Sequence, residues 1–306
     1  MDKLKIFAPA TVANVSCAFD ILGFALDTVG DEMTFTKTTE KLVQITLPEN
    51  SNLPTDPLKN VAGVVAIEML KKANADFGVL IEIDKRIKPG SGIGSSAASS
   101  AGAAYGVNRL LGDIYDNTEL VQFAMLGEAL ASGVAHADNV APAIFGGFAL
   151  VRSYSPLEVI KLNSPNELFC TVIHPQIEVK TEKSRKILKK NILLKDAVEQ
   201  WGNIAGLISG LYSEDYDLIG RSLQDKIVEP VRSLFIPLFY DVKKSFMDAG
   251  ALGGGISGSG PSVFALSRGE KQAEKVAEAM RKVYSQTNID FDIHVSAINS
   301  VGIKEI

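Results

Sequence analysis

The chain has 306 residues, of which 46% are hydrophobic and 22% are charged, and its formal net charge at pH 7 is −5. This composition is ordinary for a globular protein, and the absence of a Lys/Arg run argues against nucleic acid or an anionic membrane as a partner. The two cysteines, Cys17 and Cys170, lack metal-site spacing and are expected to be reduced apolar residues. The N-terminus lacks the apolar core of a signal peptide, so we expect a cytoplasmic protein.

The first half of the chain reads as strands followed by helices. Apolar and polar residues alternate in short runs that predict strands at 4–8, 19–26, 32–36, 42–47, 79–87 and 148–153. Helical spacing predicts helices at 61–72, 95–111 and 118–131. Two prolines indicate a loop at 52–57, and many polar groups indicate a long connection at 136–147.

Ser, Pro and Asn accumulate between residues 152 and 164, which predicts a domain boundary, with an N-terminal domain at 1–155 and a C-terminal domain at 156–306. In the second half we expect strands at 168–174, 262–267 and 291–298, mostly helices from 181 to 249, a glycine cluster at 250–260 and a helix at 270–284. Strands precede helices in both halves, which favours two α+β layers over a strictly alternating parallel sheet.

The strongest local signal is a Gly/Ser-rich segment between a predicted strand and a predicted helix. It consists of Pro89, Gly90, Ser91, Gly92, Ile93, Gly94, Ser95, Ser96, Ala97, Ala98 and Ser99. Glycines let backbone N–H groups approach an oxyanion, and the unpaired N–H groups at a helix start favour phosphate. Ser95 and Ser96 add hydroxyl groups, one for phosphate and one for a metal ion bound to it. A simple capped turn uses the same residue types, but so many of them at one junction favour a phosphate site.

Two other nucleotide-binding motifs compete for this segment. A Walker loop ends in Gly-Lys-Ser/Thr, and the Lys is absent here. The residues from Gly92 to Ala97 satisfy a G-x-G-x-x-A dinucleotide pattern, which needs a second strand ending in an acidic residue about 20 positions later. Asp113 and Asp116 instead follow the end of a helix, and another helix comes next. The dinucleotide interpretation is therefore the weaker one.

Three segments together resemble the superfamily of galactokinase, homoserine kinase, mevalonate kinase and phosphomevalonate kinase (GHMP kinases). The Gly/Ser-rich segment is similar to its Pro-x-x-x-Gly-Leu-Gly-Ser-Ser-Ala-Ala signature, with Ile93 in the Leu position, while residues 9–23 look like its first motif and residues 253–262 like its third. The resemblance spans nearly the whole chain. It implies an ATP-dependent small-molecule kinase with a ribosomal-S5-like N-terminal domain, a ferredoxin-like C-terminal domain, an active site between them and commonly a homodimer.

Within this superfamily the details resemble the homoserine kinases. Asn14 with Phe19-Asp20, the segment from His136 to Pro142, Thr181-x-x-x-Arg185 and Glu229-Pro230-x-Arg232 are similar to their substrate segments, although Ala18 replaces a usual glycine. The substrate implied is L-homoserine, the products O-phospho-L-homoserine and ADP, and the pathway threonine biosynthesis. Asp20 could pair with the ammonium and the two arginines with the carboxylate. The implied substrate-binding residues are Asn14, Asp20, His136, Asn139, Thr181, Arg185 and Arg232.

The resemblance also implies the cofactors, which are ATP and Mg²⁺. Glu128 matches the magnesium carboxylate of the family, and Ser96 would supply the companion hydroxyl. Asn60, at the start of the helix after the proline-rich loop, would contact adenine. Taken alone, each of these residues could also have no part in binding. Glu128, for example, could be a solvated charge on the face of a helix.

No general base is evident in the sequence. Relatives such as mevalonate kinase place an aspartate near the attacking hydroxyl, where this chain has Asn139, and a carboxamide cannot accept that proton at neutral pH. Asp138 is adjacent, but neighbouring side chains on an extended segment tend to point in opposite directions. We therefore predict that no side chain acts as base and that the proton passes to the phosphate.

Two alternatives to a homoserine kinase stay open at this point. Another GHMP kinase, acting on mevalonate or a sugar alcohol, would be favoured by Asp in place of Asn139 or by a Lys in the N-terminal motif, and neither is present. A non-catalytic metabolite sensor on the same fold would be indicated by the loss of Glu128 or Ser96, and both are present.

Overall fold

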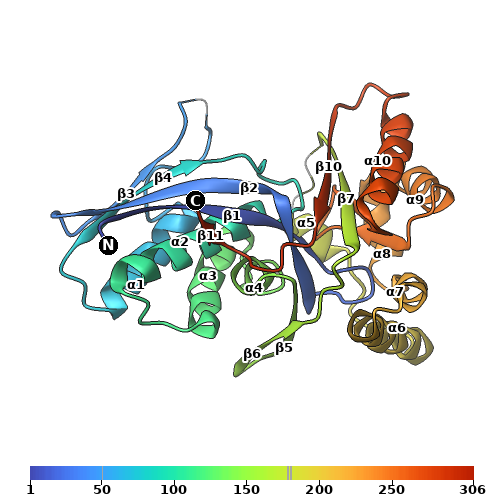
Figure 1. The fold of residues 1–306 in the computed structure, drawn as a ribbon, viewed down its shortest axis with the longest axis horizontal. Coiled ribbons are helices and arrows are strands. Elements are labelled where there is room, and N and C mark those ends of the chain that lie inside the picture. The colour runs from blue at the N-terminus through green and yellow to red at the C-terminus, as the bar shows by residue number, and fades with distance from the viewer. Residues whose placement is uncertain (50, 178, 180) are drawn as a thin grey trace.

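The computed structural model describes residues 1–49, 51–177, 179 and 181–306. Within these residues the strands form a seven-stranded sheet and a four-stranded sheet, which lie one after the other along the long axis of the molecule (Figure 1). Each sheet carries helices, so the expected α+β architecture is confirmed.

The larger sheet is centred on β2, which pairs antiparallel with β1 on one side and with β4 on the other. β3 runs parallel to β4, β5 pairs with the start of β2, and β6 pairs with β5. The strands are β1 (Lys3–Ala13), β2 (Leu22–Thr38), β3 (Val43–Thr46), β4 (Gly78–Asp84), β5 (Phe148–Tyr154), β6 (Leu157–Leu162) and β11 (Lys304–Glu305). The helices beneath this sheet (Figure 1) are α1 (Val61–Lys72), α2 (Ser95–Leu111), α3 (Asn117–Ser132) and α4 (Val140–Phe145).

Helix α2 packs unusually closely against β2 because small residues form its inner face. A Cβ added at Gly102 would lie 2.4 Å from the sulfur of Met33, and one at Gly106 would lie 2.4 Å from the ring of Phe35. Ala and Ser occupy most of the neighbouring positions and are buried. This packing fixes the start of α2, and with it the Gly/Ser-rich loop, at one end of the sheet.

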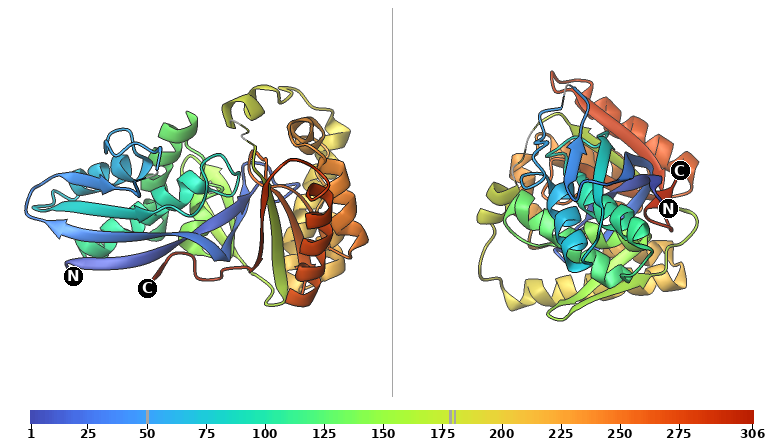
Figure 2. Two further views of the ribbon diagram at one scale, coloured as in Figure 1. Left: turned by 90° about the horizontal axis from the view of Figure 1, so that it is seen from above. Right: turned by 90° about the vertical axis from the view of Figure 1, so that its left-hand side faces the viewer.

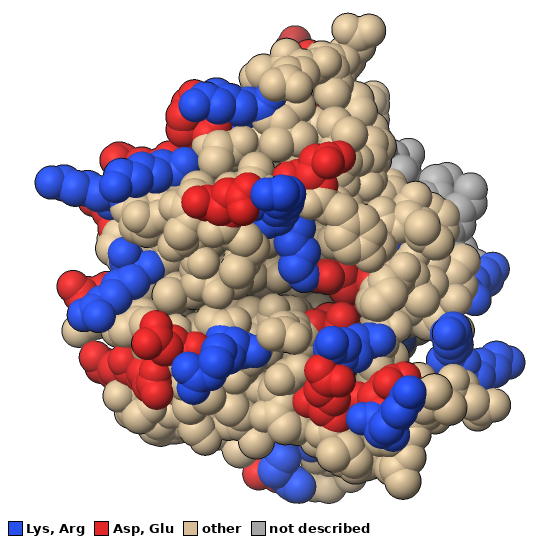
Figure 3. All heavy atoms as spheres, turned by 90° about the vertical axis from the view of Figure 1, so that its right-hand side faces the viewer, with Lys and Arg blue, Asp and Glu red and all other residues tan. Residues whose placement is uncertain are grey.

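The smaller sheet is fully antiparallel, with strand order β10-β7-β9-β8. Its strands are β7 (Leu168–Pro175), β8 (Gly253–Ile256), β9 (Val263–Arg268) and β10 (Phe291–Ala297). The helices of this half are α5 (Thr181–Lys186), α6 (Leu194–Ser213), α7 (Tyr216–Ser222), α8 (Glu229–Arg232), α9 (Phe239–Asp248) and α10 (Glu270–Tyr284), with a 3-10 turn at Ser233–Phe235. Helices α9 and α10 lie against one face of the sheet, as Figure 2 shows from above. On the end of the molecule that these helices form, acidic and basic side chains are interspersed (Figure 3).

Several elements differ from those expected from the sequence. The strand expected at 32–36 and residues 22–26 of the strand expected at 19–26 are parts of the single strand β2, whereas residues 19–21 lie in the turn before it. Strand β1 pairs with β2 on both sides of a register shift between Pro9 and Thr11. The connection expected at 136–147 contains the short helix α4. The apolar residues of this helix, Val140–Phe145, pack against strands of the larger sheet. The glycine cluster contains strand β8, where a Cβ at Gly254 would lie 2.1 Å from a β9 carbonyl oxygen.

The predicted boundary region at 152–164 contains the β5–β6 hairpin, and both strands belong to the larger sheet. The last strand, β11, also returns to that sheet and pairs with β1. The larger sheet therefore includes residues up to Leu162 and also the last strand of the chain. The predicted division into domains at residue 155 stays a prediction. No helix of the described residues is both long and apolar enough to cross a bilayer.

Candidate active site

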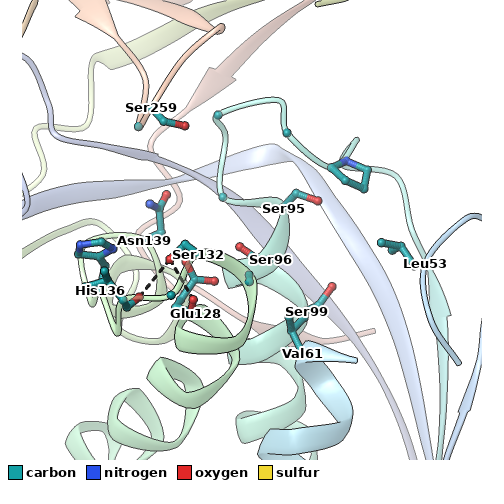
Figure 4. Close-up of a pocket in the computed structure, with 18 of the residues that line it drawn as sticks. Leu53, Val61, Ser95, Ser96, Ser99, Glu128, Ser132, His136, Asn139 and Ser259 are labelled. Carbon is teal, nitrogen blue, oxygen red and sulfur yellow. Dashed lines mark hydrogen bonds between the residues drawn. The ribbon is translucent and has the colours of Figure 1, made fainter. Parts of the chain in front are cut away.

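A cavity of about 880 Å³ lies between the two halves and is lined by residues of both. Figure 4 shows Ser95, Ser96 and Ser99 along the start of α2, with Glu128, Ser132 and His136 facing them and Ser259 approaching from the C-terminal half. The Gly/Ser-rich loop, the N-terminal motif and the late glycine cluster all contribute to this cavity. Three segments that are far apart in sequence therefore meet at one site.

The loop presents its backbone to the cavity through its glycines. Gly90, Gly92 and Gly94 have φ angles of 75°, 82° and 70°, which strongly favour glycine. Gly94 caps α2, and the helix start has no side-chain cap, so its N–H groups are available to an anion. The predicted loop residues that line the cavity are Pro89, Gly90, Gly92, Gly94, Ser95, Ser96 and Ser99, whereas Ser91, Ile93, Ala97 and Ala98 are buried away from it.

The late glycine cluster fixes the loop from the C-terminal side. The hydroxyl of Ser257 donates to the Gly92 carbonyl at 2.8 Å, and that of Ser262 donates to the Ser91 carbonyl at 2.6 Å. A Cβ at Gly92 would lie 2.5 Å from the Gly260 carbonyl oxygen, so only glycine permits this approach. The loop is thus held rigid by contacts between the two halves, which favours precise positioning of a phosphate.

Lys85 is a cavity residue that the sequence did not single out. Its Nζ is 2.5 Å from Asp31 Oδ2 and also donates to the Ser95 carbonyl at 2.6 Å and to the Ser99 hydroxyl at 3.1 Å. Burial lowers the pKa of Lys85, while the Asp31 carboxylate opposes that shift. Lys85 and Asp31 thus form a buried pair beneath the first turn of α2, and Lys85 lies next to the place where phosphate is expected.

The two serines at the start of α2 have different environments. Ser95 donates its hydroxyl to the Ile87 carbonyl at 2.9 Å, so it stabilises the loop itself. Ser96 lies next to Glu128, and its hydrogen bonding favours the charged form of that carboxyl. This arrangement supports Ser96 as the companion of Glu128, as we expected from the resemblance.

Glu128 is 7% exposed, and its Oε1 has no hydrogen-bond partner. Burial raises the pKa of Glu128 to about 7, against the opposing effects of Ser96 and Lys85. A buried, unpartnered carboxylate oxygen next to a hydroxyl is a donor set that suits a hard cation such as Mg²⁺. No three His, Cys, Asp or Glu side chains in the described part of the chain could hold a metal together. Mg²⁺ is commonly bound by one or two carboxylates together with substrate phosphates and water.

The predicted amino-acid-binding residues gather at the end of the cavity that Gly258 of the late glycine cluster forms. Arg185 Nη2 lies 2.7 and 2.8 Å from the two oxygens of Asp20, and Arg232 donates to the Gly258 carbonyl at 2.9 Å. Burial lowers the pKa of Arg232 to about 10. The site therefore combines one carboxylate with two guanidinium groups, which complements a zwitterion.

Three polar residues shape this end of the cavity. Asn14 donates to the Gly258 carbonyl at 2.6 Å and accepts from the Asp20 N–H at 2.9 Å, so its amide orders the turn that carries Asp20. Asn139 Oδ1 accepts a hydrogen bond from Thr11 at 2.8 Å. His136 Nε2 is 3.9 Å from Asp20 Oδ2, and burial lowers the pKa of this histidine. A neutral His136 can offer both a donor and an acceptor.

Two predicted residues have less direct placements. The Asn60 side chain caps α1 through the N–H groups of Ala62 and Gly63 and donates to the Pro54 carbonyl at 2.8 Å. Its amide is largely occupied by the backbone, so a direct contact with adenine stays a prediction. Thr181 begins α5, and its side chain lies outside the described part of the structure.

Asp138 is buried and lines the cavity, and this location leads to a prediction about pH. Burial first, then the nearby Asp20 and Glu128 carboxylates, raises the pKa of Asp138 from 3.8 to about 7. Between about pH 4 and pH 7, Asp138 is therefore protonated in the folded protein but ionised in the unfolded chain. Because the folded state binds the additional proton, the free energy of unfolding falls as the pH rises through this range. We expect Asp138→Asn to reduce this fall by at most about 4 kcal/mol, measured by urea unfolding at several pH values. An identical pH dependence of the two proteins would contradict the expectation.

Comparison with known proteins places the chain in a family. Residues 60–147 match the GHMP kinases N terminal domain, and residues 207–286 match the GHMP kinases C terminal. A homoserine kinase of Chloroherpeton thalassium is 46% identical over 317 residues, covering 99% of both chains. A homoserine kinase of Methanococcus vannielii is 42% identical over 93% of this chain and 94% of its own.

Solved structures agree with this placement. The crystal structure of homoserine kinase from Cytophaga hutchinsonii matches with a TM-score of 0.96 and 51% identity, covering 100% of this chain and 98% of the other. Mevalonate kinase of L. major, in complex with R-mevalonate, shares the fold with a TM-score of 0.73 at 15% identity, covering 97% of this chain and 99% of its own. The chain therefore belongs to the GHMP kinases and, among them, to the homoserine kinase family.

Proposed function

We propose that the cavity between the two halves is the place where this chain phosphorylates L-homoserine. As a homoserine kinase, the chain transfers the γ-phosphoryl group of ATP to the side-chain hydroxyl, giving O-phospho-L-homoserine and ADP, a step in threonine biosynthesis. One observation carries the assignment of the site: the phosphate-binding loop and the Asp20, Arg185 and Arg232 cluster line the same cavity.

The nucleotide would lie along the part of the cavity between α1 and α2. The loop amides and the charge of Lys85 favour the phosphate groups there. Leu53 and Val61, both labelled in Figure 4, line the far part of this region and give it apolar walls suited to the adenine base. In this position the terminal phosphate points toward the amino-acid end.

Ser96 and Glu128 would hold Mg²⁺ together with phosphate oxygens. When bound, the ion neutralises charge on the phosphates, and such positioning and neutralisation are what phosphoryl transfer mainly requires. Glu128 fits this role because its Oε1 is buried without a partner, and a cation supplies the compensation that the protein lacks.

The amino-acid end would bind homoserine by exchanging an internal ion pair for the substrate. Arg185 is bonded to Asp20 in this structure. The substrate ammonium would take over Asp20, and its carboxylate would take over Arg185 and Arg232, so that each carboxylate keeps a cationic partner. A ligand with only one of these charges would leave a buried partner without compensation, which favours zwitterions.

The role of a general base can be tested through Asp138. We propose that no side chain removes the hydroxyl proton, because Asn139 cannot accept it and its amide is bonded to Thr11. Asp138→Asn should then retain kcat within about tenfold of the wild-type value, measured in a pre-steady-state assay of the chemical step. A loss of several orders of magnitude with intact substrate binding would show that Asp138 is the base.

A coupled ADP-release assay tests the proposed function. The protein is supplied with ATP and Mg²⁺ and, in separate reactions, homoserine, mevalonate, galactose or shikimate. We expect release with homoserine alone. Release with mevalonate or galactose would indicate another GHMP kinase activity, and no release with any acceptor would favour a metabolite sensor.

The homodimer stays a prediction from the family resemblance, and the cytoplasmic location stays a prediction from the sequence. Sedimentation at several protein concentrations tests the first: a mass of twice 32.8 kDa would support it, and a single chain at all concentrations would contradict it.

A further inference from the structure

Phe19 is a half-buried aromatic residue that lies outside both hydrophobic clusters of the described residues. It belongs to the tight connection between β1 and β2, after the buried Cys17 and Ala18 and before Asp20. Large apolar side chains normally pack into a core, because removing them from water is favourable. Phe19 therefore needs another explanation.

The ring of Phe19 contacts two cations. The guanidinium carbon of Arg185 lies 5.3 Å from the ring centroid, and that of Arg232 lies 4.9 Å from it. Both distances fall within the range of about 6 Å in which an aromatic face attracts a cation. The arginines come from α5 and α8, so the ring joins side chains that no local backbone geometry brings together.

Holding these two arginines close together is unfavourable without compensation. Arg232 is 3% exposed, and after burial the charge of Arg185 is a further cause that lowers its pKa. The Nε atoms of both arginines are buried and lack a hydrogen-bond partner. The negative face of the Phe19 ring offsets part of the repulsion, and the free Nε donors point to an anionic ligand at this place.

We propose that Phe19 is a positioning residue for the amino-acid substrate, whose ring holds Arg185 and Arg232 where both can bind one carboxylate. This inference rests on the proposed function. Both arginines line the cavity and Phe19 does not, so Phe19 acts through them and makes no substrate contact of its own. The aromatic ring, rather than apolar bulk, is the property that matters.

The test compares Phe19→Leu with Phe19→Tyr and uses Phe77→Leu as a matched control. Leu keeps apolar bulk without an aromatic face, whereas Tyr keeps the ring. Phe77 is also half-buried and has Lys37 Nζ 4.3 Å from its ring centroid, but it does not line the cavity. We expect Phe19→Leu to raise the KM for homoserine about tenfold. Phe19→Tyr and Phe77→Leu should both keep the wild-type KM.

A second acceptor separates positioning of the arginines from general loosening of the fold. The acceptor 3-amino-1-propanol has the ammonium and hydroxyl of homoserine but no carboxylate, so it should be a poor acceptor whose kcat/KM is measured at high concentration. Phe19→Leu should leave this kcat/KM and the KM for ATP within about twofold of wild type. Equal losses with both acceptors, an unchanged KM for homoserine, or a Tyr variant as impaired as the Leu variant would each overturn the inference. A wild-type protein that releases no ADP with homoserine would overturn the proposed function as well, so the two failures are distinguishable.

Discussion

Glu128→Gln is expected to lower kcat by about 10³-fold, the loss typical of removing one group that stabilises transition-state charge. Gln keeps the shape of the side chain but removes the negative charge that we assign to Mg²⁺. The apparent affinity for Mg²⁺ should therefore fall as well, measured as ADP release over a series of Mg²⁺ concentrations. Stability should not fall, because the wild-type carboxyl is buried with an unpartnered oxygen.

Glu119→Gln on the same helix is the matched control for this variant. Glu119 belongs to the capping box at the start of α3, and Gln also satisfies that motif. The control should keep wild-type kcat and Mg²⁺ dependence. If Glu128→Gln kept kcat within about tenfold at low Mg²⁺, the assignment of Glu128 as a metal ligand would be wrong.

Arg185→Leu is expected to raise the KM for homoserine about 100-fold, the value for losing charge-assisted hydrogen bonds to one group. The variant also leaves Asp20 without its present partner. The KM for ATP should stay near its wild-type value, because Arg185 belongs to the amino-acid end of the cavity. Steady-state kinetics with each substrate varied in turn measures both constants.

Arg152→Leu provides the control for the removal of an arginine. Arg152 is exposed and forms an ion pair with Glu158 within the β5–β6 hairpin, so its loss should change neither KM. The side chain of Arg185 is 32% exposed, and the fold should therefore tolerate its replacement. An equal rise in the KM for ATP and for homoserine would show that Arg185 supports the whole cavity rather than the amino acid.

The sequence predicted those parts of the fold that local signals determine. Helices α1 and α2 have the predicted bounds, because Asn60 caps the first and Gly112 ends the second in a left-handed conformation. Strand β8 was missed because glycine has low strand propensity, and only contact with β9 explains its use there. Strand β6 was missed because Ser, Pro and Asn around it resemble a linker.

In the site, too, local sequence signals were predictable and contacts between distant residues were not. The Gly/Ser-rich loop was evident from composition alone, whereas Lys85 looks like an ordinary solvated charge until the fold brings Asp31 next to it from 54 positions away. The roles of Ser95 and Ser96 also depend on tertiary structure, because the carbonyl of Ile87 determines which hydroxyl turns inward. Phe19 was part of a motif in the sequence, but its contacts with two arginines required the fold.

Identification of the phosphorylated product tests the central claim most directly. The protein is incubated with ATP, Mg²⁺ and L-homoserine, and the products are followed by phosphorus NMR. We expect a phosphate monoester on the side-chain oxygen of homoserine, formed in equal amount to ADP. ADP accompanied only by inorganic phosphate, or ATP left unchanged, would contradict the account.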